Sequence, residues 1–288
     1  MERLAFIGFG EAATAFLTGW ADRRPARVSA FDIKTDAPQT RTEMLARYEA
    51  HVICGAMEIA AALEEAEAVF SVVTADQALA AARAAAPALP EGALWLDCNS
   101  CAPETKRRAA EAIEAAGGRY VDVAVMAPVR KLQHRVPLLV SGPHAGLACA
   151  VLRGLDMRPE IAGDTVGQAS TVKMLRSVMV KGLEALCAEC FLAARRAGVE
   201  AQVLASLEAS DPDIDWRHRA SYNLERMMVH GTRRAAEMRE VAATLSALGL
   251  PGGLSPAIAE WQEAIARLGL DPGADELSER LDRVLAKL

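Results

Sequence analysis

Short apolar runs alternate with helical segments along the first part of the chain. Most runs are apolar at successive positions, which is typical of strands in a parallel sheet that helices cover on both faces. The predicted strands are residues 4–7, 27–31, 51–54, 68–73, 93–97, 120–125 and 137–142, and amphipathic helices are predicted at 41–49, 57–65, 77–88 and 103–116. This alternation predicts an α/β fold with a doubly wound sheet of the Rossmann type.

The alternation stops near residue 164, and only helical periodicity follows. The segment 168–197 contains no proline, which predicts one helix of about thirty residues that needs partners on more than one face. Further helices are predicted at 201–208, 220–248, 255–268 and 274–288. We therefore expect two domains, residues 1–164 with the sheet and an all-helical domain of residues 165–288. The long helix also favours a homodimer, in which two copies cover each other's apolar faces.

A glycine turn follows the first predicted strand. It reads Gly8, Phe9, Gly10, Glu11, Ala12 and Ala13, the pattern G-x-G-x-x-A at the start of a helix. In a dinucleotide-binding fold the first glycine permits the tight turn, the second lets a diphosphate approach the backbone, and the small third residue lets the helix lie close to the strand. The unpaired N–H groups of the helix start then attract the diphosphate. These six residues are predicted to bind a nicotinamide dinucleotide.

Three polar residues at the ends of predicted strands extend this cofactor site. Asp32 ends the second strand about twenty residues beyond the glycines, where a carboxylate accepts hydrogen bonds from the adenosine ribose. Thr74 and Asn99 follow later strands, at the edge where open α/β sheets bind ligands. Asp32 repels a 2′-phosphate and so favours NAD, whereas nearby Lys34 and Thr35 leave NADP as an alternative. The competing interpretation is that Asp32 only ends the strand.

Composition argues against several classes of protein. No apolar run is long enough to cross a bilayer, and a net charge of -6 argues against non-specific nucleic-acid binding. The six cysteines stand without a secretion signal, so we expect reduced thiols and a cytoplasmic protein. The C-x-x-C pairs at residues 98–101 and 187–190 are far apart in the sequence, so buried thiols explain them better than zinc does. No metal site is predicted.

Lys173 is the best-placed candidate for acid/base chemistry. Oxidation of an alcohol by hydride transfer also releases the hydroxyl proton, so a proton acceptor must lie beside the cofactor. Lys173 lies near the start of the long predicted helix, and it is the only charged residue from Gly167 to Leu175. Partial removal from water would favour its neutral amine. Ser177, four residues later, shares its helix face and is a candidate substrate contact. The alternative is a lysine that extends into solvent.

These motifs resemble those of the β-hydroxyacid dehydrogenases, the family of 3-hydroxyisobutyrate and 6-phosphogluconate dehydrogenases, over essentially the whole chain. The chain is most similar to a phosphogluconate-dehydrogenase-like branch with a C-terminal domain of unknown function. Residues 7–13 correspond to the cofactor turn, and residues 97–103 to the motif D-x-S-T-x-x-P. Residues 122–128 stand at the substrate motif D-A-P-V-S-G-G. Residues 167–173 match G-x-x-x-x-x-K, which implies that Lys173 is the catalytic acid/base.

The substrate side departs from the family pattern. The Ser-Gly-Gly that grips the substrate carboxylate in the family reads Met126, Ala127 and Pro128 here. Ser177 replaces an asparagine, and His230 with Gly231 stands where a Lys-Asp pair faces the pocket. His230 is equally well explained as a histidine at a helix packing surface. The resemblance implies a substrate unlike the best-known ones, contacted by Ser100, Met126, Ala127, Ser177 and His230.

We therefore expect an NAD(P)-dependent oxidoreductase that transfers a hydride between nicotinamide and a small, polar hydroxy acid or related carbonyl compound. An imine reductase of the same architecture is one alternative, and an NAD(P)-binding sensor without turnover is another. The basic segment 130–135 would attract an acidic substrate or simply lie in solvent. The acidic segment 211–216 is expected to cap a helix rather than to bind a metal.

Overall fold

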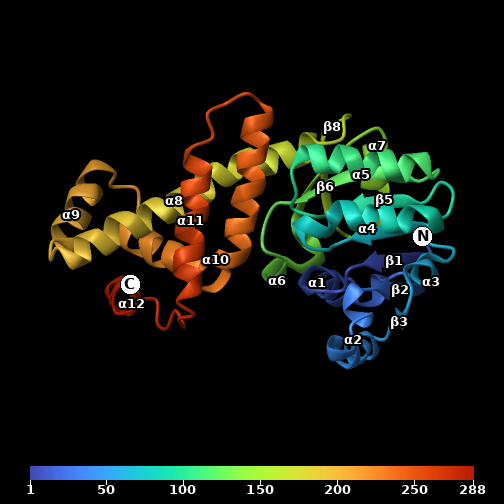
Figure 1. The fold of residues 1–288 in the computed structure, drawn as a ribbon, viewed down its shortest axis with the longest axis horizontal. Helices are drawn as coiled ribbons and strands as arrows, with labels where there is room; N and C mark the ends of the chain where they lie inside the picture. Colours follow the sequence, from blue (N-terminus) through green and yellow to red (C-terminus); the bar gives the residue numbers. More distant parts are fainter. The chain divides into compact units, whose positions relative to one another are not determined.

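The computed structural model describes residues 1–288 and divides the chain into two compact units, Met1–Lys173 and Met174–Leu288. The first unit is a sheet covered by helices, and the second is built from helices alone, as the sequence predicts (Figure 1). The predicted domain boundary at residues 164–165 falls between the last strand, which ends at Gly163, and helix α8, which begins at Gln168. Helix α8 starts in the first unit and continues through the second.

An eight-stranded sheet forms the first unit. Its strands lie in the order β3-β2-β1-β4-β5-β6-β7-β8, and every neighbouring pair is parallel except β6 with β7. The order reverses between β1 and β4, which is where open α/β sheets bind their ligands. The strands are β1 (Arg3–Ile7), β2 (Arg27–Phe31), β3 (Cys54–Gly55), β4 (Ala68–Ser71), β5 (Leu94–Asp97), β6 (Arg119–Val125), β7 (Pro137–Ser141) and β8 (Arg158–Gly163).

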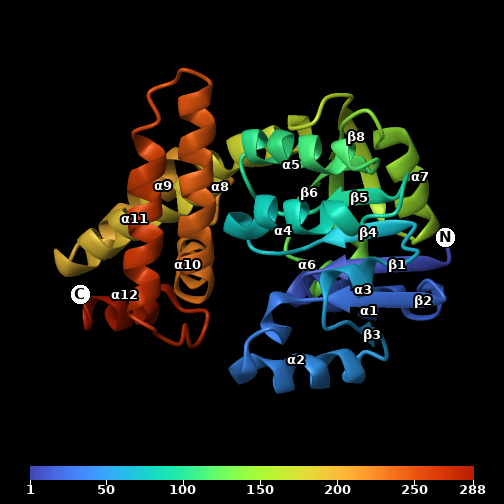
Figure 2. The same cartoon turned by 45° about the vertical axis from the view of Figure 1, so that its right-hand side comes forward.

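Helices cover both faces of this sheet because both faces are apolar. Along β1, Leu4 and Phe6 belong to one buried layer, whereas Ala5 and Ile7 belong to the other. The first layer packs against α1, α2 and α7, and the second against α3, α4 and α5 (Figure 2). The helices are α1 (Glu11–Trp20), α2 (Pro38–Ala50), α3 (Ile59–Leu63), α4 (Ala78–Ala85), α5 (Pro103–Ala115), α6 (Val129–Leu132) and α7 (Ala145–Gly154), with 3-10 turns at Ala21–Arg23, Ile33–Thr35, Ala75–Gln77, Ala86–Ala88 and Gln133–Arg135.

The sheet differs from the prediction at its two edges. The hydrophobic pattern does not predict β8, a strand that contains Pro159 and is exposed at Arg158, Glu160 and Ile161. Proline lacks an N–H, and β8 tolerates it because β8 is an edge strand. At the other edge, β3 begins at Cys54 rather than residue 51, because the chain turns at Val52, where φ is 52°. The sheet is therefore mixed and mostly parallel, with β6–β7 as its antiparallel pair.

The second unit buries two apolar clusters between its helices. One cluster contains Phe191, Met227 and Leu281, and the other contains Met238 and Ile258. The helices are α8 (Gln168–Arg196), α9 (Glu200–Ser210), α10 (Trp216–Ala247), α11 (Leu254–Arg267) and α12 (Leu277–Leu285), and no strand accompanies them. None of the helices in either unit has both the length and the apolar content that a bilayer crossing requires.

A glycine lets α10 and α11 approach each other closely. A Cβ atom on Gly231 would lie 2.3 Å from the carbonyl oxygen of Gln262 and 2.9 Å from the Cβ of Ala266. Gly231 therefore faces α11. At this position the β-hydroxyacid dehydrogenases that the sequence resembles carry an acidic residue. In this chain, the glycine instead allows two helices to pack closely.

Gly231→Ala is expected to destabilise the protein by about 1–3 kcal/mol, because overpacking a close interface costs that much. Gly146→Ala is the matched control, since Gly146 also lies in a helix, α7, and a Cβ there would meet no atom within 4 Å. The control should be unchanged or more stable by about 0.5–1 kcal/mol, because alanine favours helix. Urea unfolding followed by circular dichroism measures both variants. Equal stability of the two would contradict close packing at residue 231.

Candidate active site at the edge of the sheet

The glycine turn joins β1 to α1 in a conformation that requires glycine. Gly8 has a φ of 87°, and a Cβ there would lie 2.8 Å from the carbonyl oxygen of Val72. Gly10 precedes the first turn of α1, and a Cβ there would meet nothing within 4 Å. The side chains of Ala13 and Phe9 are fully buried in the layer between α1 and the sheet. The space beside Gly10 is therefore open to a ligand.

Asp32 ties the end of β2 to this turn. Its Oδ2 accepts a hydrogen bond from the backbone N–H of Phe9 at 2.7 Å, and its Oδ1 accepts one from the N–H of Lys34 at 3.0 Å. Each oxygen keeps a lone pair that a ribose hydroxyl can use. A depression of about 550 Å³ beside the turn is lined in part by Gly10, Arg47 and Arg130. Two guanidinium groups beside a helix start suit a diphosphate.

Predicted site residues follow three neighbouring parallel strands. Thr74 lies beyond β4, Asn99 and Ser100 follow β5, and Met126 and Ala127 follow β6. The carboxyl ends of parallel strands meet at one edge of a sheet, and the glycine turn after β1 belongs to the same edge. The first unit thus brings these predicted site residues and the glycine turn to the same edge of the sheet.

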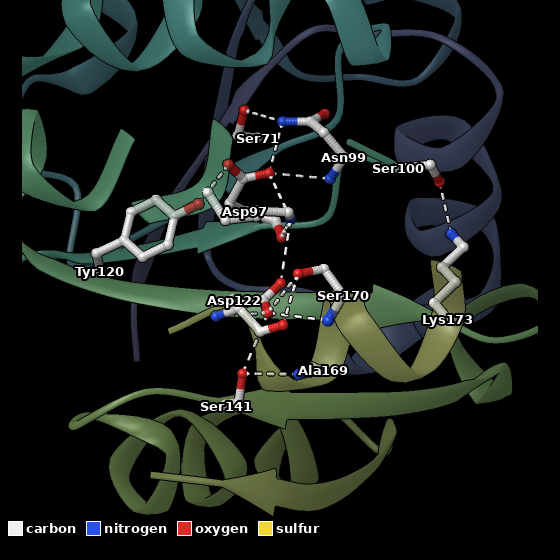
Figure 3. A network of polar contacts seen from close by, with 12 residues as sticks. Ser71, Asp97, Asn99, Ser100, Tyr120, Asp122, Ser141, Ala169, Ser170 and Lys173 are labelled. Atoms are coloured by element: carbon white, nitrogen blue, oxygen red, sulfur yellow. Dashed lines mark hydrogen bonds and ion pairs between the residues drawn. The ribbon is translucent and has the colours of Figure 1, made fainter. Parts of the chain in front are cut away.

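A buried polar network joins β5, β6 and β7 beneath this edge (Figure 3). Asp97, Asp122 and Ser141 pair in register across the three strands. The ammonium group of Lys106 lies 2.9 Å from Asp97 Oδ1 and 3.4 Å from Asp122 Oδ1, and all three of these charged side chains are at most 1% exposed. Lys106 is the only cation within ion-pair distance of either carboxylate. Two buried acids therefore share one buried base.

Asp97 is the last residue of β5 and organises the loop that follows. Its Oδ1 accepts hydrogen bonds from the backbone N–H of Asn99 at 3.0 Å and from the Asn99 Nδ2 at 2.7 Å. Its Oδ2 accepts one from the Tyr120 hydroxyl at 2.7 Å, and Lys106 also donates to its backbone oxygen at 2.6 Å. The carboxylate thereby fixes the course of the chain into Ser100.

Asn99 presents a buried oxygen that has no partner. Its Nδ2 donates to Asp97 and to Ser71 Oγ at 2.9 Å, which sets the orientation of the amide because a carboxylate only accepts. The Oδ1 atom is buried and makes no hydrogen bond. Buried acceptors are normally satisfied, so this one fits a hydroxyl or amide donor of a nicotinamide nucleotide. With the open space beside Gly10, the residues present fit the predicted dinucleotide.

Asp122 caps the start of α8. Its Oδ2 accepts hydrogen bonds from the N–H of Gly167 at 3.2 Å, the N–H and hydroxyl of Ser170 at 3.0 Å each, and the Ser141 hydroxyl at 3.1 Å. Ser141 Oγ in turn accepts from the N–H of Ala169 at 2.9 Å. A negative charge also interacts favourably with the dipole of a helix at its N-terminus. The first turn of α8 is thus attached to the sheet.

The attached helix carries Lys173 to the loop after β5. Lys173 Nζ donates a hydrogen bond to Ser100 Oγ at 2.5 Å (Figure 3). The Lys173 side chain is half-buried, so it points toward this loop instead of extending into solvent. The amine and the hydroxyl therefore form a pair one residue away from the unpartnered oxygen of Asn99.

Burial and charge shift the pKa values of this network. Burial alone would lower the pKa of Lys106, but the carboxylates of Asp97 and Asp122 outweigh burial and hold the pKa well above its usual value. Burial, and then the charge of Asp97, raise the pKa of Tyr120 well above its usual value. Burial raises the pKa of the Cys98 thiol to about 12. Lys106 is therefore charged at neutral pH, while Tyr120 and Cys98 are neutral, and Cys98 is not an activated nucleophile.

The two charged segments noted in the sequence have structural partners. Arg130 pairs with Glu11 at 3.1 Å, and Arg135 pairs with Asp156, so the basic segment consists of short helical turns tied to acids. In the acidic segment, Asp215 accepts a hydrogen bond at 2.9 Å from a backbone N–H in the first turn of α10. The capping role predicted for that segment is confirmed.

Ser177 and His230 lie in the second unit. Ser177 is buried, and its Oγ accepts a hydrogen bond from Lys181 Nζ at 3.0 Å; Lys181 is in turn 2.9 Å from Glu237 Oε2. Burial lowers the pKa of Lys181, while Glu237 opposes that shift. His230 is half-buried on α10. Contact of Ser177 or His230 with a substrate stays a prediction.

Sequence reasoning misses Lys106, the centre of the network. A signal for it exists, because Lys106 shares the buried face of α5 with Ala109, Ala110 and Ile113. A lysine at an apolar helix position calls for a buried acid as partner. Asp97 and Asp122 each begin a sequence motif described above. Only the fold shows that both carboxylates face the same lysine.

The fold and this edge together define an NAD(P)-binding, dehydrogenase-like domain. Residues 3–150 match the NAD binding domain of 6-phosphogluconate dehydrogenase, and the match covers just over half of the chain. The protein belongs to this family, which confirms the resemblance seen in its motifs. Residues 194–265 match a domain of unknown function, DUF1932.

Individual relatives agree with the family. The 3-hydroxyisobutyrate dehydrogenase of Pseudomonas aeruginosa is 27% identical over 222 residues, which cover 75% of this chain and 72% of that enzyme. The structure of a conserved hypothetical protein from Sinorhizobium meliloti 1021 is 38% identical with a TM-score of 0.80, and covers 100% of this chain and 97% of its own. A conserved protein of unknown function, with structural similarity to 3-hydroxyacid dehydrogenases, is 32% identical with a TM-score of 0.72 over 93% of this chain and 100% of its own. The two more similar proteins thus carry no assigned activity.

Tyr120→Phe is expected to change how stability depends on pH. Folded Tyr120 keeps its proton at pH values where the unfolded tyrosine loses it, so stability falls as pH rises above about 10. Without the hydroxyl, this fall should be less steep by about 1.4 kcal/mol per pH unit. Urea unfolding between about pH 8 and 11 measures the slope.

Tyr222→Phe is the control for this slope, because Tyr222 is 50% exposed and should leave it unchanged. At neutral pH, Tyr120→Phe should also lose about 1–3 kcal/mol, since a buried Asp97 oxygen loses its donor. The same pH slope in the variant and the wild type would contradict a neutral, buried Tyr120.

Proposed function

We propose that the protein is an NAD(P)-dependent oxidoreductase of a small, polar hydroxy acid or related carbonyl compound, with Lys173 as general acid/base. The hydrogen bond between Lys173 Nζ and Ser100 Oγ is the observation that carries the proposal. Ser100 directly follows Asn99, whose Oδ1 has no partner, at the edge where this fold binds dinucleotides. The family match supports the cofactor, and similarity to 3-hydroxyisobutyrate dehydrogenase supports a hydroxy acid.

Four features of this chain would hold the cofactor. The start of α1 at Gly10 suits the diphosphate, Asp32 the adenosine ribose, and Asn99 Oδ1 a donor on the nicotinamide nucleoside. Thr74 borders the same edge. The negative charge of Asp32 disfavours a 2′-phosphate, so NAD is the preferred form. When bound, the nicotinamide ring exchanges a hydride at its C4 atom.

The Lys173–Ser100 pair supplies the proton transfer. In the oxidative direction, Lys173 as a neutral amine takes the proton of the substrate hydroxyl, and a bound nicotinamide would be the acceptor of the hydride from the same carbon. The products are a carbonyl compound and a protonated Lys173, which returns the proton to water. Ser100 accepts a hydrogen bond from Lys173 and can donate its own hydrogen to the substrate oxygen. Met126, Ala127, Ser177 and His230 are the proposed further contacts with the substrate.

Lys173→Ala should lower kcat by about a hundredfold or more and leave cofactor affinity within about twofold, because the amine acts on the substrate proton. A panel of hydroxy acids and cyclic imines, assayed with NAD(H) and NADP(H), gives the turnover. Fluorescence titration with NADH and NADPH gives the affinities. Arg196→Ala, an exposed change in the last turn of α8, is the control and should match the wild type.

The outcomes separate the alternatives. Turnover of hydroxy acids that survives Lys173→Ala would remove the acid/base assignment. Turnover of imines alone would make the protein an imine reductase. Tight cofactor binding without turnover of any compound would make it a sensor.

We further propose that the protein forms a homodimer through an exposed face of α8. Leu175, Met179 and Leu186 are 39%, 66% and 60% exposed. Their spacing of four and seven residues places them on one side of the helix. An exposed apolar stripe at heptad spacing is typical of helices that pair with another helix.

Met179→Glu should convert the dimer to a monomer, because two carboxylates would be buried at the interface. Leu250→Glu, a change at a 54% exposed residue outside the stripe, should leave the dimer intact. Sedimentation velocity measures the mass of each species. A monomeric wild-type protein would overturn the proposal.

A further inference from the structure

Lys106 takes no part in the reaction proposed above, yet it lies at the centre of the polar network that holds the site residues. It points from the apolar face of α5 into the sheet and is 1% exposed. Burying an ammonium group is unfavourable unless acids and acceptors surround it. The acids here are Asp97 and Asp122, which pair in register on neighbouring strands. Lys106 is what allows two carboxylates to stand side by side in the core.

Each carboxylate is linked through hydrogen bonds to the segment that carries one member of the Lys173–Ser100 pair. Asp97 holds the backbone and side chain of Asn99, the residue before Ser100. Asp122 holds the first turn of α8, one turn before Lys173. The two branches begin at the ammonium group of Lys106. They meet again at the 2.5 Å hydrogen bond between Lys173 and Ser100, which Figure 3 shows.

We propose that Lys106 is a positioning residue that sets the approach of Lys173 to Ser100 by holding Asp97 and Asp122 together. The importance of this approach for catalysis rests on the proposed function, but the geometric link does not. Without the ammonium group, the two carboxylates would repel each other, so that one would move away or take up a proton. A protonated or displaced Asp122 is a weaker cap, and the first turn of α8 would loosen.

Lys106→Met, which keeps the length of the side chain and removes its charge, is the direct test. The amides of Gly167 and Ser170 should exchange hydrogen roughly tenfold faster, which corresponds to a loss of about 1.4 kcal/mol in local stability. The amides of β1 should keep their protection. Lys173 should also react about threefold or more faster with acetic anhydride, measured by mass spectrometry relative to exposed Lys34, because it has lost its place at Ser100.

Two variants separate positioning from general loss of stability. Lys106→Arg keeps the charge and should restore slow exchange at residues 167–170 at least in part, and slow acetylation of Lys173 with it. Ile113→Ala removes a fully buried side chain from the same helix, α5, without touching the network. It should lower global stability but leave the acetylation of Lys173 unchanged. Equal effects of Ile113→Ala and Lys106→Met on Lys173 would overturn the proposal.

Ser170→Ala covers the case in which Lys106→Met does not fold. It removes one hydrogen bond to Asp122 and keeps all three buried ions, Lys106, Asp97 and Asp122. Faster exchange at residues 167–170 and faster acetylation of Lys173 are expected in this variant, in the same direction as for Lys106→Met. No change in either would overturn the proposal, because the link from Asp122 to α8 is the route it requires.

These readouts need no turnover, so they are independent of the proposed function. If Lys173→Ala retains full activity while Lys106→Met frees Lys173, the function fails and the positioning role stands. If Lys173→Ala is inactive while Lys106→Met leaves exchange and acetylation unchanged, the function stands and the positioning role fails. Once a substrate is known, Lys106→Met should also lower kcat by about tenfold or more.

Discussion

A buried carboxylate, that of Asp122, joins the sheet to the helix that carries the candidate acid/base residue. One of its oxygens accepts hydrogen bonds from Gly167, Ser170 and Ser141. Such a carboxylate interacts favourably with the helix dipole, but burying its charge is unfavourable without a cation nearby. Lys106 is that cation, and it neutralises Asp97 as well. The position of Lys173 therefore depends on an ion cluster in the interior of the protein.

The architecture of the sheet explains why the polar residues of the candidate site lie at one of its edges. Its two apolar faces bury β1, β4 and β5 completely or nearly so, which leaves only the strand ends for polar groups. Because these strands are parallel, the residues that follow them share a side with the glycine turn. Asp32 then ties β2 to the turn through the N–H of Phe9. The open space at Gly10 and the unpartnered Asn99 oxygen are consequences of that arrangement.

Local patterns predicted what depends on neighbouring residues in the sequence. The glycine turn and the start of α8 could be found because turn geometry and helix periodicity are properties of a few consecutive residues. The strand β8 could not, since an edge strand with Pro159 has no distinct apolar pattern. Lys106 was missed for a different reason. Its partners, Asp97 and Asp122, belong to two strands, so its role follows from tertiary structure. The sequence shows only that a charged residue occupies the apolar face of α5.

Buried charges also specify how the helices of the second unit align. Glu184 of α8 lies 3.0 Å from Arg234 of α10 and accepts a hydrogen bond from Gln262 of α11 at 2.7 Å. Burial raises the pKa of Glu184 and lowers the pKa of Arg234, so each charge depends on its partner. A shift of one helix by a single residue would separate the pair, whereas an apolar core repacks more readily. Glu184 and Met179 lie on opposite sides of α8. The rotation of α8 that buries Glu184 against Arg234 therefore also exposes Met179 and the apolar stripe to which it belongs.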